Sequence, residues 1–411
     1  MRVLLYSINF HPECVGVAKY NTEMFEWLRK NGFDVRVITA PPSFPAWKIF
    51  ENYSNDYTVE NIASEDGAYK VFRSPVYMPR NISFINRLIY LFSFFISSMW
   101  NVFQNLKWRP DVVFVTEPSF IAAPNALLFK YFSKSKIWYH IQDFEIGLIG
   151  NRGWLNAFFN PLLKFYYNLF IKRCECVTTI SEDMKKSINN MGVNREIDLF
   201  KNWVDASVFE RVIKSDTDIY KSKINIPIDK KIVMYSGSMG AKQGVEIMAL
   251  IARHYFQQEV RDLHFVFCGE GATKKDLVNA CEGLSNVSIF GLVDEYELPK
   301  LLKCADIHLL PQRIGMEASV LPSKLLGMMA SGKPVVVGAT IDTCLANVVS
   351  MCGVVVEPES VNSYIDGLNY LISDSISSEI LGRAGFDFVC ETYNKSIILN
   401  QVVSKLRLMR V

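Results

Sequence analysis

The chain has 411 residues, of which half are apolar and 13% are aromatic, and its formal net charge is +2. This composition is too apolar for a disordered chain, and the small net charge does not indicate a nucleic-acid-binding protein. At roughly 150 residues per domain, the length predicts two or three domains. The nine cysteines lack the paired spacing of a zinc site, which favours reduced thiols in a cytoplasmic protein.

The first half of the chain alternates between short apolar runs and longer helical patterns. Strands are predicted at 3–9, 34–42, 111–118, 136–145 and 176–181, and helices at about 17–31, 82–107, 120–132 and 153–173. Residues 43–80 are expected to form a long loop region with short strands. This alternation predicts a parallel, doubly wound α/β sheet, with Gly16 at the turn from the first loop into the first helix.

The predicted helix 82–107 carries no charged residue between Arg87 and Lys107, a stretch that approaches the length of a membrane span. A polar stripe interrupts it, and its members are Ser93, Ser97, Ser98, Asn101, Gln104 and Asn105. The pattern predicts a helix that lies in a core or on a membrane surface and does not span the membrane.

Residues 80–173 hold eleven basic and four acidic side chains. Basic residues beside aromatic helices favour a surface that rests on anionic lipid. The alternative is a solvated basic face over an ordinary core.

The charged segment 210–231 contains no clear strand and is interpreted as an interdomain linker. Asp216-x-Asp218 within it imitates a metal-binding motif, but its place in a polar segment with no preceding strand indicates coincidence, and no metal is expected. From Ile232 the pattern restarts, which predicts a second sheet of the same class. Its six strand-like runs are 232–237, 264–271, 287–293, 306–312, 334–339 and 353–359.

Two strand–loop–helix junctions in this second half have the residues of a phosphate site. In the first, Gly237 lets the backbone approach a ligand and Lys242 reaches into the gap. In the second, Pro322 opens a helix, Ser323 supplies a hydroxyl and Lys324 supplies a charge, beside unpaired backbone N–H groups. The two junctions could clamp one diphosphate, and the alternative is a pair of ordinary strand–helix turns.

The segments HPECVGVAKY, HIQD, SEDM, KNWVD, SGSMGAKQG, CGEG and LPSKLLGMMASGKPVV occur in the order found in retaining glycosyltransferases of family 4, which the chain resembles. The resemblance implies the GT-B fold, in which two Rossmann-like domains face each other across a cleft. It places an acceptor-binding domain at 1–205, joined by a C-terminal helix at about 391–411, and a nucleotide-sugar-binding domain at 206–390. The nearest types are colanic-acid fucosyltransferases and O-antigen L-fucosaminyltransferases of bacteria.

The resemblance also assigns roles to residues. It implies a catalytic set of His140, Lys242 and Glu317. Donor contacts are expected from Gly16, Gly237, Ser238, Lys242, Gly269, Leu292, Leu321, Pro322, Ser323 and Lys324. Acceptor-side residues are His11, Glu13, Asp143 and Glu145. The family's Glu-x7-Glu signature falls at Ser319 and Gly327, where neither residue is acidic, and Glu317 is the nearest carboxylate.

The function implied is the retaining, metal-independent transfer of N-acetyl-L-fucosamine or L-fucose from a nucleotide donor, with UDP favoured over GDP. The expected acceptor is a polyprenyl-diphosphate-linked saccharide at the inner, cytoplasmic face of the membrane, in O-antigen or exopolysaccharide assembly. Lys242 and helix N–H groups would stabilise the leaving diphosphate. Two alternatives stay open: a UDP-sugar 2-epimerase, and a nucleotide-sugar-binding protein without transfer activity, which the missing Glu pair favours. No cofactor and no nucleic-acid partner is expected.

Overall fold

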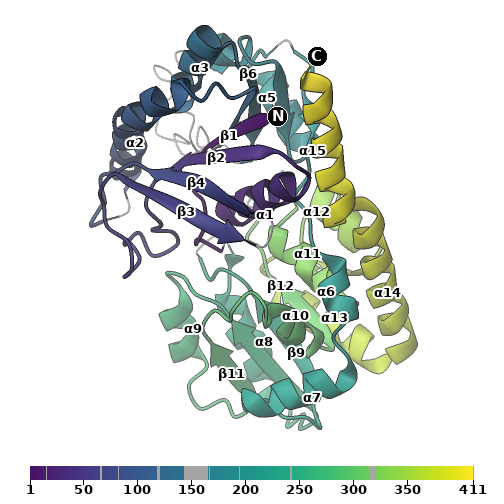
Figure 1. Ribbon diagram of the computed structural model, residues 1–411. Coiled ribbons are helices and arrows are strands. Elements are labelled where there is room, and N and C mark those ends of the chain that lie inside the picture. Colours follow the sequence, from purple (N-terminus) through teal and green to yellow (C-terminus); the bar gives the residue numbers. More distant parts are fainter. Residues whose placement is uncertain are drawn as a thin grey trace. The chain divides into compact units, whose positions relative to one another are not determined.

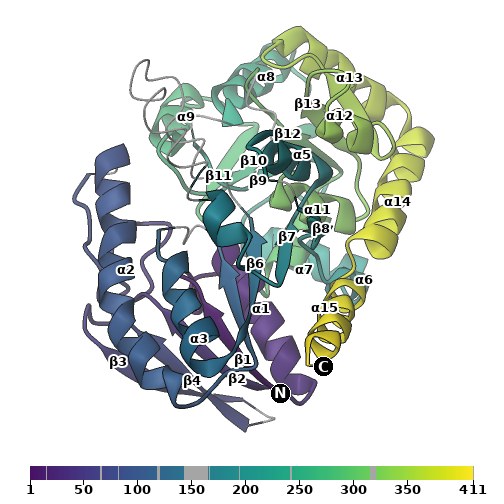
Figure 2. The same cartoon turned by 90° about the horizontal axis from the view of Figure 1, so that it is seen from above.

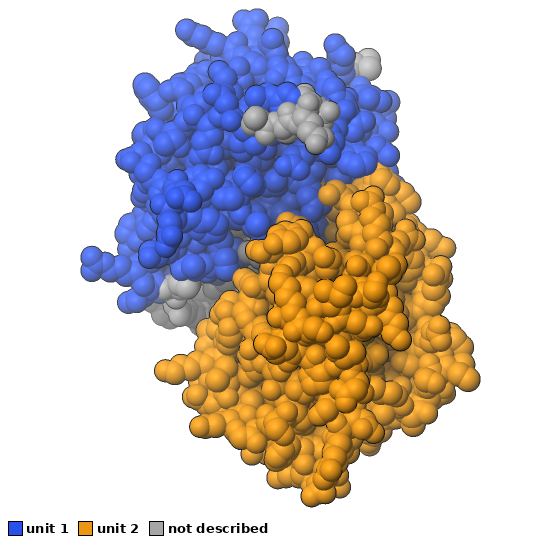
Figure 3. Space-filling model, turned by 60° about the horizontal axis from the view of Figure 1, so that its bottom comes forward, with its two compact units in different colours: residues 1–201, 398–411 blue, residues 202–397 orange. Residues whose placement is uncertain are grey.

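The computed structural model describes residues 1–14, 16–64, 67–81, 83–117, 121–142, 165, 167–193, 195–240, 243–314 and 321–410. The chain forms two compact units (Figures 1 and 3). Unit 1 consists of Met1–Lys201 and Ile398–Val411, and unit 2 of Asn202–Ile397. Each unit is built on one mainly parallel sheet, which confirms the predicted class of two α/β domains.

The sheet of unit 1 has the order β3-β4-β2-β1-β5-β6-β7-β8 and is parallel except for the pairing of β3 with β4. The chain runs from β1 to one side and returns to β5 on the other side of β1. The switch point of this sheet therefore lies between β1 and β5. Its strands are β1 (Arg2–Tyr6), β2 (Asp34–Thr39), β3 (Thr58–Ser64), β4 (Gly67–Arg73), β5 (Val112–Thr116), β6 (Lys136–Ile141), β7 (Cys176–Thr179) and β8 (Asp198–Leu199).

The helices of unit 1 are α1 (Val17–Lys30), α2 (Phe84–Leu106), the 3-10 turn η1 (Ala123–Asn125), α3 (Ala126–Ser133), α5 (Glu182–Asn190) and most of α15 (Lys395–Met409). Helix α15 begins in unit 2 and returns to unit 1, where the Lys405 ammonium pairs with the Asp198 carboxylate. The Lys136 ammonium also donates to the Met409 carbonyl oxygen at 2.6 Å. These contacts attach the C-terminal end of the chain to the first sheet.

Helix α2 turns its polar side toward the interior of unit 1. Ser98, Asn101 and Asn105 are at most 2% exposed. The Ser98 hydroxyl shares a 2.6 Å hydrogen bond with the Tyr6 hydroxyl, and the Asn101 amide donates to the Arg73 carbonyl oxygen at 3.0 Å. These three members of the predicted polar stripe therefore face the core, whereas Gln104 is exposed. None of the described helices is both long and apolar enough to cross a membrane.

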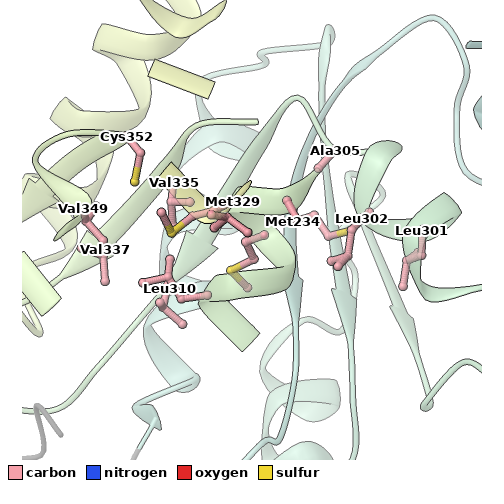
Figure 4. Packing of buried hydrophobic residues seen from close by; sticks show 14 of the residues in the cluster. Met234, Leu301, Leu302, Ala305, Leu310, Met329, Val335, Val337, Val349 and Cys352 are labelled. Atoms are coloured by element: carbon pink, nitrogen blue, oxygen red, sulfur yellow. The ribbon is translucent and has the colours of Figure 1, made fainter. Parts of the chain in front are cut away.

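The sheet of unit 2 is parallel throughout and has the order β11-β10-β9-β12-β13-β14. The six predicted strand runs correspond to its six strands, which confirms that part of the prediction. The strands are β9 (Lys231–Ser236), β10 (Leu263–Cys268), β11 (Val287–Phe290), β12 (Ile307–Leu310), β13 (Val335–Gly338) and β14 (Gly353–Val356). Figure 4 shows how strand residues such as Met234, Leu310 and Val337 pack against Met329 and Val349 from the covering helices.

The helices of unit 2 are α6 (Ala206–Glu210), α7 (Lys214–Lys223), α8 (Glu246–Gln257), α9 (Lys274–Ala280), α10 (Leu298–Lys303), α11 (Ser323–Ala330), α12 (Cys344–Val349), α13 (Val361–Ser373) and α14 (Ser375–Thr392). Helices α8 and α13 share a side of the sheet, and α11 packs against α10 and α14.

The prediction that 210–231 is a linker is wrong, because the whole segment belongs to unit 2 and contains α7. Charged residues dominate its sequence, yet Tyr220 and Ile226 are buried in the core. The Asp216 carboxylate accepts a hydrogen bond from the Ile213 backbone N–H at 3.0 Å, so it caps the first turn of α7. This local role accounts for one acid of the Asp-x-Asp motif.

We expect Asn101→Ala to lower the free energy of unfolding of unit 1 by about 1–3 kcal/mol, because it leaves the buried Ser74 hydroxyl and Arg73 carbonyl without their hydrogen-bond donor. Gln104→Ala on the same helix, whose side chain is exposed, is the matched control and should change it by less than about 0.5 kcal/mol. Urea denaturation measures both. Equal effects of the two substitutions would contradict the inward orientation of the polar stripe.

Candidate phosphate-binding site and the switch-point loops

The candidate site in unit 2 is formed where β9 and β12 end. Strand β9 is followed by strands on both sides of it in the sheet, so the switch point lies between β9 and β12. Ligands of doubly wound sheets bind beyond the carboxyl ends of the strands at this point. The loop after β9 leads to α8 and the loop after β12 leads to α11. These are the two junctions that the sequence identified.

Four of the predicted site residues cannot be placed. Lys242 in the loop after β9, Glu317 in the loop after β12, and Asp143 and Glu145 after β6 all lie outside the described residues. The roles assigned to them stay predictions.

A chain of hydrogen bonds joins the two junctions of unit 2. The Lys324 ammonium in the first turn of α11 donates to the Tyr235 hydroxyl at 2.9 Å and lies 4.7 Å from the centre of the Tyr235 ring. The Tyr235 hydroxyl in turn donates to the Ser238 carbonyl oxygen. Tyr235 is completely buried. The lysine is therefore held over the loop after β9 by a side chain with little freedom to move.

Glycines bring the backbone segments of this site close together. A Cβ atom on Gly237, whose φ is 152°, would lie 2.7 Å from Lys324 Cδ. A Cβ atom on Gly269, at the end of β10, would lie 1.9 Å from the Gly237 carbonyl oxygen. No side chain fits at Gly269 unless the loop after β9 moves. The predicted residues Gly237, Ser238, Gly269 and Lys324 thus share one neighbourhood.

Lys324 carries a charge that the described residues do not neutralise. No described carboxylate lies within ion-pairing distance of its ammonium group, and its side chain is partly buried. Desolvation lowers the pKa of Lys324 to about 8. The charged form is thus disfavoured in the free protein, and an anion bound nearby would stabilise it.

The remaining predicted donor residues frame the start of α11 and the end of β11. Leu321 is buried, Pro322 is the N-cap of α11 and Ser323 is exposed at its first position. The first N–H groups of a helix have no intrahelical acceptor, so they are available to a ligand. Leu292, in the loop after β11, is 52% exposed.

Sequence reasoning missed Tyr235 and Arg313. Arg313 follows β12, and its guanidinium pairs with the Glu246 carboxylate at the start of α8 and with the Glu359 carboxylate at 3.2 Å. A Cβ atom on Gly244 would lie 3.2 Å from Arg313 Cγ. Arg313 therefore links the loop after β12 both to α8 and to Glu359, in the turn that precedes α13. The sequence signal that could have identified Arg313 is a charged residue shortly after a buried strand.

In unit 1 the buried charged residues Glu13 and Arg73 hold the loop after β1 in place. The Glu13 carboxylate accepts hydrogen bonds from the Ser43 and Phe44 backbone N–H groups at 2.7 and 2.8 Å. The Arg73 guanidinium, which pairs with Glu60, donates to the His11 carbonyl oxygen at 2.8 Å. The acceptor-side predictions His11 and Glu13 thus lie at the switch-point edge of this sheet.

Burial has opposite effects on the pKa values of Glu13 and His11. Desolvation raises the pKa of Glu13, although three hydrogen bonds oppose the shift, and desolvation lowers the pKa of His11, helped by the Arg73 charge. Gly16 is the N-cap of α1 with φ 60°, a conformation that glycine adopts without strain. Glu13 in this structure holds the 43–44 backbone against the loop after β1.

His140 and Glu117 are buried at the ends of adjacent strands. His140 is 1% exposed, its Nδ1 atom is 2.9 Å from the Thr178 hydroxyl, and burial lowers its pKa to about 3. Its ring is therefore neutral at pH 7, and its contact with a sugar stays a prediction. Glu117, which sequence reasoning did not single out, is fully buried and accepts hydrogen bonds from the Tyr139 and Tyr167 hydroxyls.

Comparison with protein-family models gives two matches in chain order. Residues 15–208 match the model described as glycosyltransferase family 4, and residues 216–388 match the model described as glycosyl transferases group 1. WcaI of Escherichia coli (strain K12), a glycosyl transferase assigned provisionally to colanic acid biosynthesis, is 34% identical over 99% of this chain and 100% of its own.

Solved structures share the fold at low sequence identity. Sucrose-phosphate synthase of Thermosynechococcus elongatus has a TM-score of 0.72 at 15% identity, covering 99% of this chain and 98% of its own. HepE of Anabaena in complex with UDP-glucose has a TM-score of 0.69 at 15% identity, covering 99% of each chain. These likenesses identify both halves as the two α/β domains of the GT-B fold.

We expect Lys324→Met to raise the free energy of unfolding of unit 2 by about 1–3 kcal/mol at pH 7, because it removes a partly buried charge that has no counterion in the described part of the chain. The folded-state pKa of Lys324 is depressed below its unfolded-state value, so the wild type gains stability as the pH rises from about 8 toward 10. The advantage of the variant should therefore shrink over that range. Urea denaturation at pH 7 and pH 9.5 tests this, with the exposed Lys275→Met as the control.

Proposed function

This chain belongs to glycosyltransferase family 4, and we propose that it transfers a 6-deoxy-L-sugar from a nucleoside-diphosphate donor to a lipid-linked saccharide. The donor sugar we favour is N-acetyl-L-fucosamine or L-fucose, carried on UDP in preference to GDP. The product enters O-antigen or exopolysaccharide assembly. The proposal covers the donor, the acceptor and the stereochemistry, whereas the transferase class follows from family membership.

The observation that carries the proposal is the charge of Lys324 at the switch point of unit 2, which no described carboxylate neutralises. A diphosphate placed there would meet the ammonium group, the first N–H groups of α11 and a glycine-lined backbone. The same sheet edge supplies the exposed Leu292, which we assign to the nucleoside. HepE, which shares the fold, binds UDP-glucose, and this favours UDP as the nucleotide.

The chemistry proposed is cleavage of the bond between the sugar and the diphosphate, with attack by the acceptor hydroxyl on the same face of the sugar and transfer of the hydroxyl proton to the leaving phosphate oxygen. Negative charge develops on the leaving oxygen, and preorganised cations and N–H groups lower the energy of that state by several kcal/mol. We assign the stabilisation of this negative charge to Lys324 and Lys242, and we place Glu317 beside the sugar. The mechanism proposed uses no metal ion.

The sugar and the acceptor are proposed from similarity. WcaI is assigned to colanic acid biosynthesis, and the segments INFHPECVGVAKYNTEM and YSGSMGAKQG resemble transferases of fucose and L-fucosamine. A polyprenyl-diphosphate-linked acceptor would place the enzyme on the inner face of the membrane as a peripheral protein. The acceptor-side residues proposed are His11, Glu13, Asp143 and Glu145.

Diphosphate affinity should depend on pH through Lys324. Because its pKa in the free protein is about 8, UDP binding should weaken by up to tenfold per pH unit above pH 8 and be nearly constant between pH 6.5 and 7.5. Lys324→Met should lower the affinity at pH 7 by about 10–100-fold and lose this dependence. Isothermal titration with UDP and GDP measures both effects.

Lys324→Arg serves as the matched control for that titration, since arginine stays charged at pH 9.5. It should retain binding at high pH even if its longer side chain weakens affinity at pH 7. Unchanged UDP affinity in Lys324→Met would remove this lysine from the donor site.

Turnover should require both a nucleotide sugar and an acceptor. We expect UDP release from UDP-N-acetyl-L-fucosamine to rise at least 100-fold on addition of a polyprenyl-diphosphate saccharide and to fall by a similar factor in Lys242→Ala. The rate should be unchanged by a chelator, and the product anomer should match the donor, as NMR can determine. Nucleotide release that does not depend on the acceptor would contradict the proposal. An epimerised donor would favour the UDP-sugar 2-epimerase, and donor binding without turnover would favour a nucleotide-sugar-binding protein without transfer activity.

A further inference from the structure

Helix α2 exposes a continuous apolar stripe on the surface of unit 1. The stripe consists of Ile85, Ile89, Phe92, Ile96, Trp100 and Phe103, whose exposed fractions are 64, 43, 52, 56, 57 and 50%. Their spacings of four and three residues keep all six within an arc of roughly 80° on a helix of 3.6 residues per turn. Isolated exposed apolar residues are ordinary, but an aligned row of six along one helix is not.

The stripe cannot be a core face of the same helix, because that face is already occupied. The buried residues Ser98, Asn101 and Asn105 lie on the opposite arc and make hydrogen bonds within unit 1. The same inward arc carries the buried apolar residues Phe94 and Val102, so α2 already has a core face and the exposed stripe is a second apolar face on the same helix. A helix held against its unit by such contacts can lie on a bilayer but cannot enter one end first.

Helix α3 extends the apolar surface. Figures 1 and 2 show α2 and α3 side by side, and the Ser133 hydroxyl at the end of α3 donates to the Leu106 carbonyl oxygen at 3.0 Å. Tyr131 and Phe132 on α3 are 64 and 69% exposed. Aromatic side chains of this kind prefer the boundary between lipid headgroups and acyl chains.

Basic residues predominate in the sequence around the two helices. No acidic residue occurs between Asp66 and Asp111, or between Glu117 and Asp143. The exposed basic residues next to the ends of α2 and α3 are Arg80, Lys107, Arg109 and Lys134. Each basic group near an anionic membrane contributes about 1 kcal/mol to binding. The surface thus combines an apolar row with a basic border.

We propose that the α2 stripe docks on an anionic lipid bilayer, with the helix axis parallel to the membrane and the six side chains at the headgroup–acyl boundary. This deepens the proposed function by assigning the membrane contact to one helix face, and it rests on that function only for the location of the acceptor. A second copy of the chain is a poorer occupant. A two-fold contact would place the same basic borders against each other.

The test is flotation of the purified full-length protein with vesicles, in the absence of donor and acceptor. Vesicles of phosphatidylethanolamine and phosphatidylglycerol should bind the wild type at least tenfold more tightly than vesicles of phosphatidylcholine. Phe92→Gln/Ile96→Gln/Trp100→Gln should weaken binding to the anionic vesicles at least tenfold. The control Ile219→Gln/Ile376→Gln/Leu408→Gln removes apolar side chains that are 69, 72 and 76% exposed on other helices, and it should bind like the wild type.

Two further measurements identify the contact. Brominated acyl chains should quench a fluorescence component that is missing in Trp100→Phe, and Lys107→Gln/Arg109→Gln should reduce the salt dependence of binding. Wild-type binding in the triple variant, or no vesicle binding by the wild type, would overturn the proposal. So would a lipid-free dimer that the triple variant abolishes, since a second copy would then be the occupant. Urea unfolding of the triple variant checks that it is folded, and none of these outcomes depends on transferase activity.

Discussion

In unit 2 the Lys324 ammonium group pairs with no carboxylate among the residues that the structure describes. The Lys324 side chain passes over Gly237, where a Cβ atom would block it, and ends on the Tyr235 hydroxyl. Tyr235 is fixed in turn by the Ser238 carbonyl oxygen. Such a charge lowers the stability of the free protein, because burial disfavours it and nothing among the described residues compensates. A site of this kind is stabilised when its anionic ligand arrives, so stability and ligand affinity oppose each other at this position.

The sequence allowed the strands, the glycines and Lys324 to be predicted, because each has a local signal. Buried parallel strands are continuous apolar runs, and a lysine in the first turn of a helix after such a strand stands out. Tyr235 had no such signal, since an aromatic residue in a buried strand is indistinguishable from core. Its role depends on the distance to a residue 89 positions away, which only the fold determines.

Helix periodicity predicted which residues of α2 share a face but left open which face is inside. Hydrophobicity alone does not decide that question, because apolar residues lie on both faces: Phe94 is buried and Trp100 is exposed. The inward face combines stacking of the Phe94 ring on the Tyr6 ring with hydrogen bonds of Ser98 and Asn101 to the Tyr6 hydroxyl and the Arg73 carbonyl. The prediction that 210–231 is a linker was wrong for the complementary reason. Its many charged residues do not indicate a helix, yet a helix is present there and buries Tyr220.

The departure from the family's Glu-x7-Glu signature at Gly327 is matched by the packing of α11. Helices α10 and α11 are in contact, and a Cβ atom on Gly327 would lie 3.2 Å from Leu302 Cδ1. Leu302 is buried and belongs to the core cluster of unit 2. A side chain at 327 would therefore require the Leu302 methyl group to shift by a few tenths of an ångström in a close-packed core. The absence of the acid is built into the interior of this unit, and a ribose bound here must be held by groups other than a side chain at position 327.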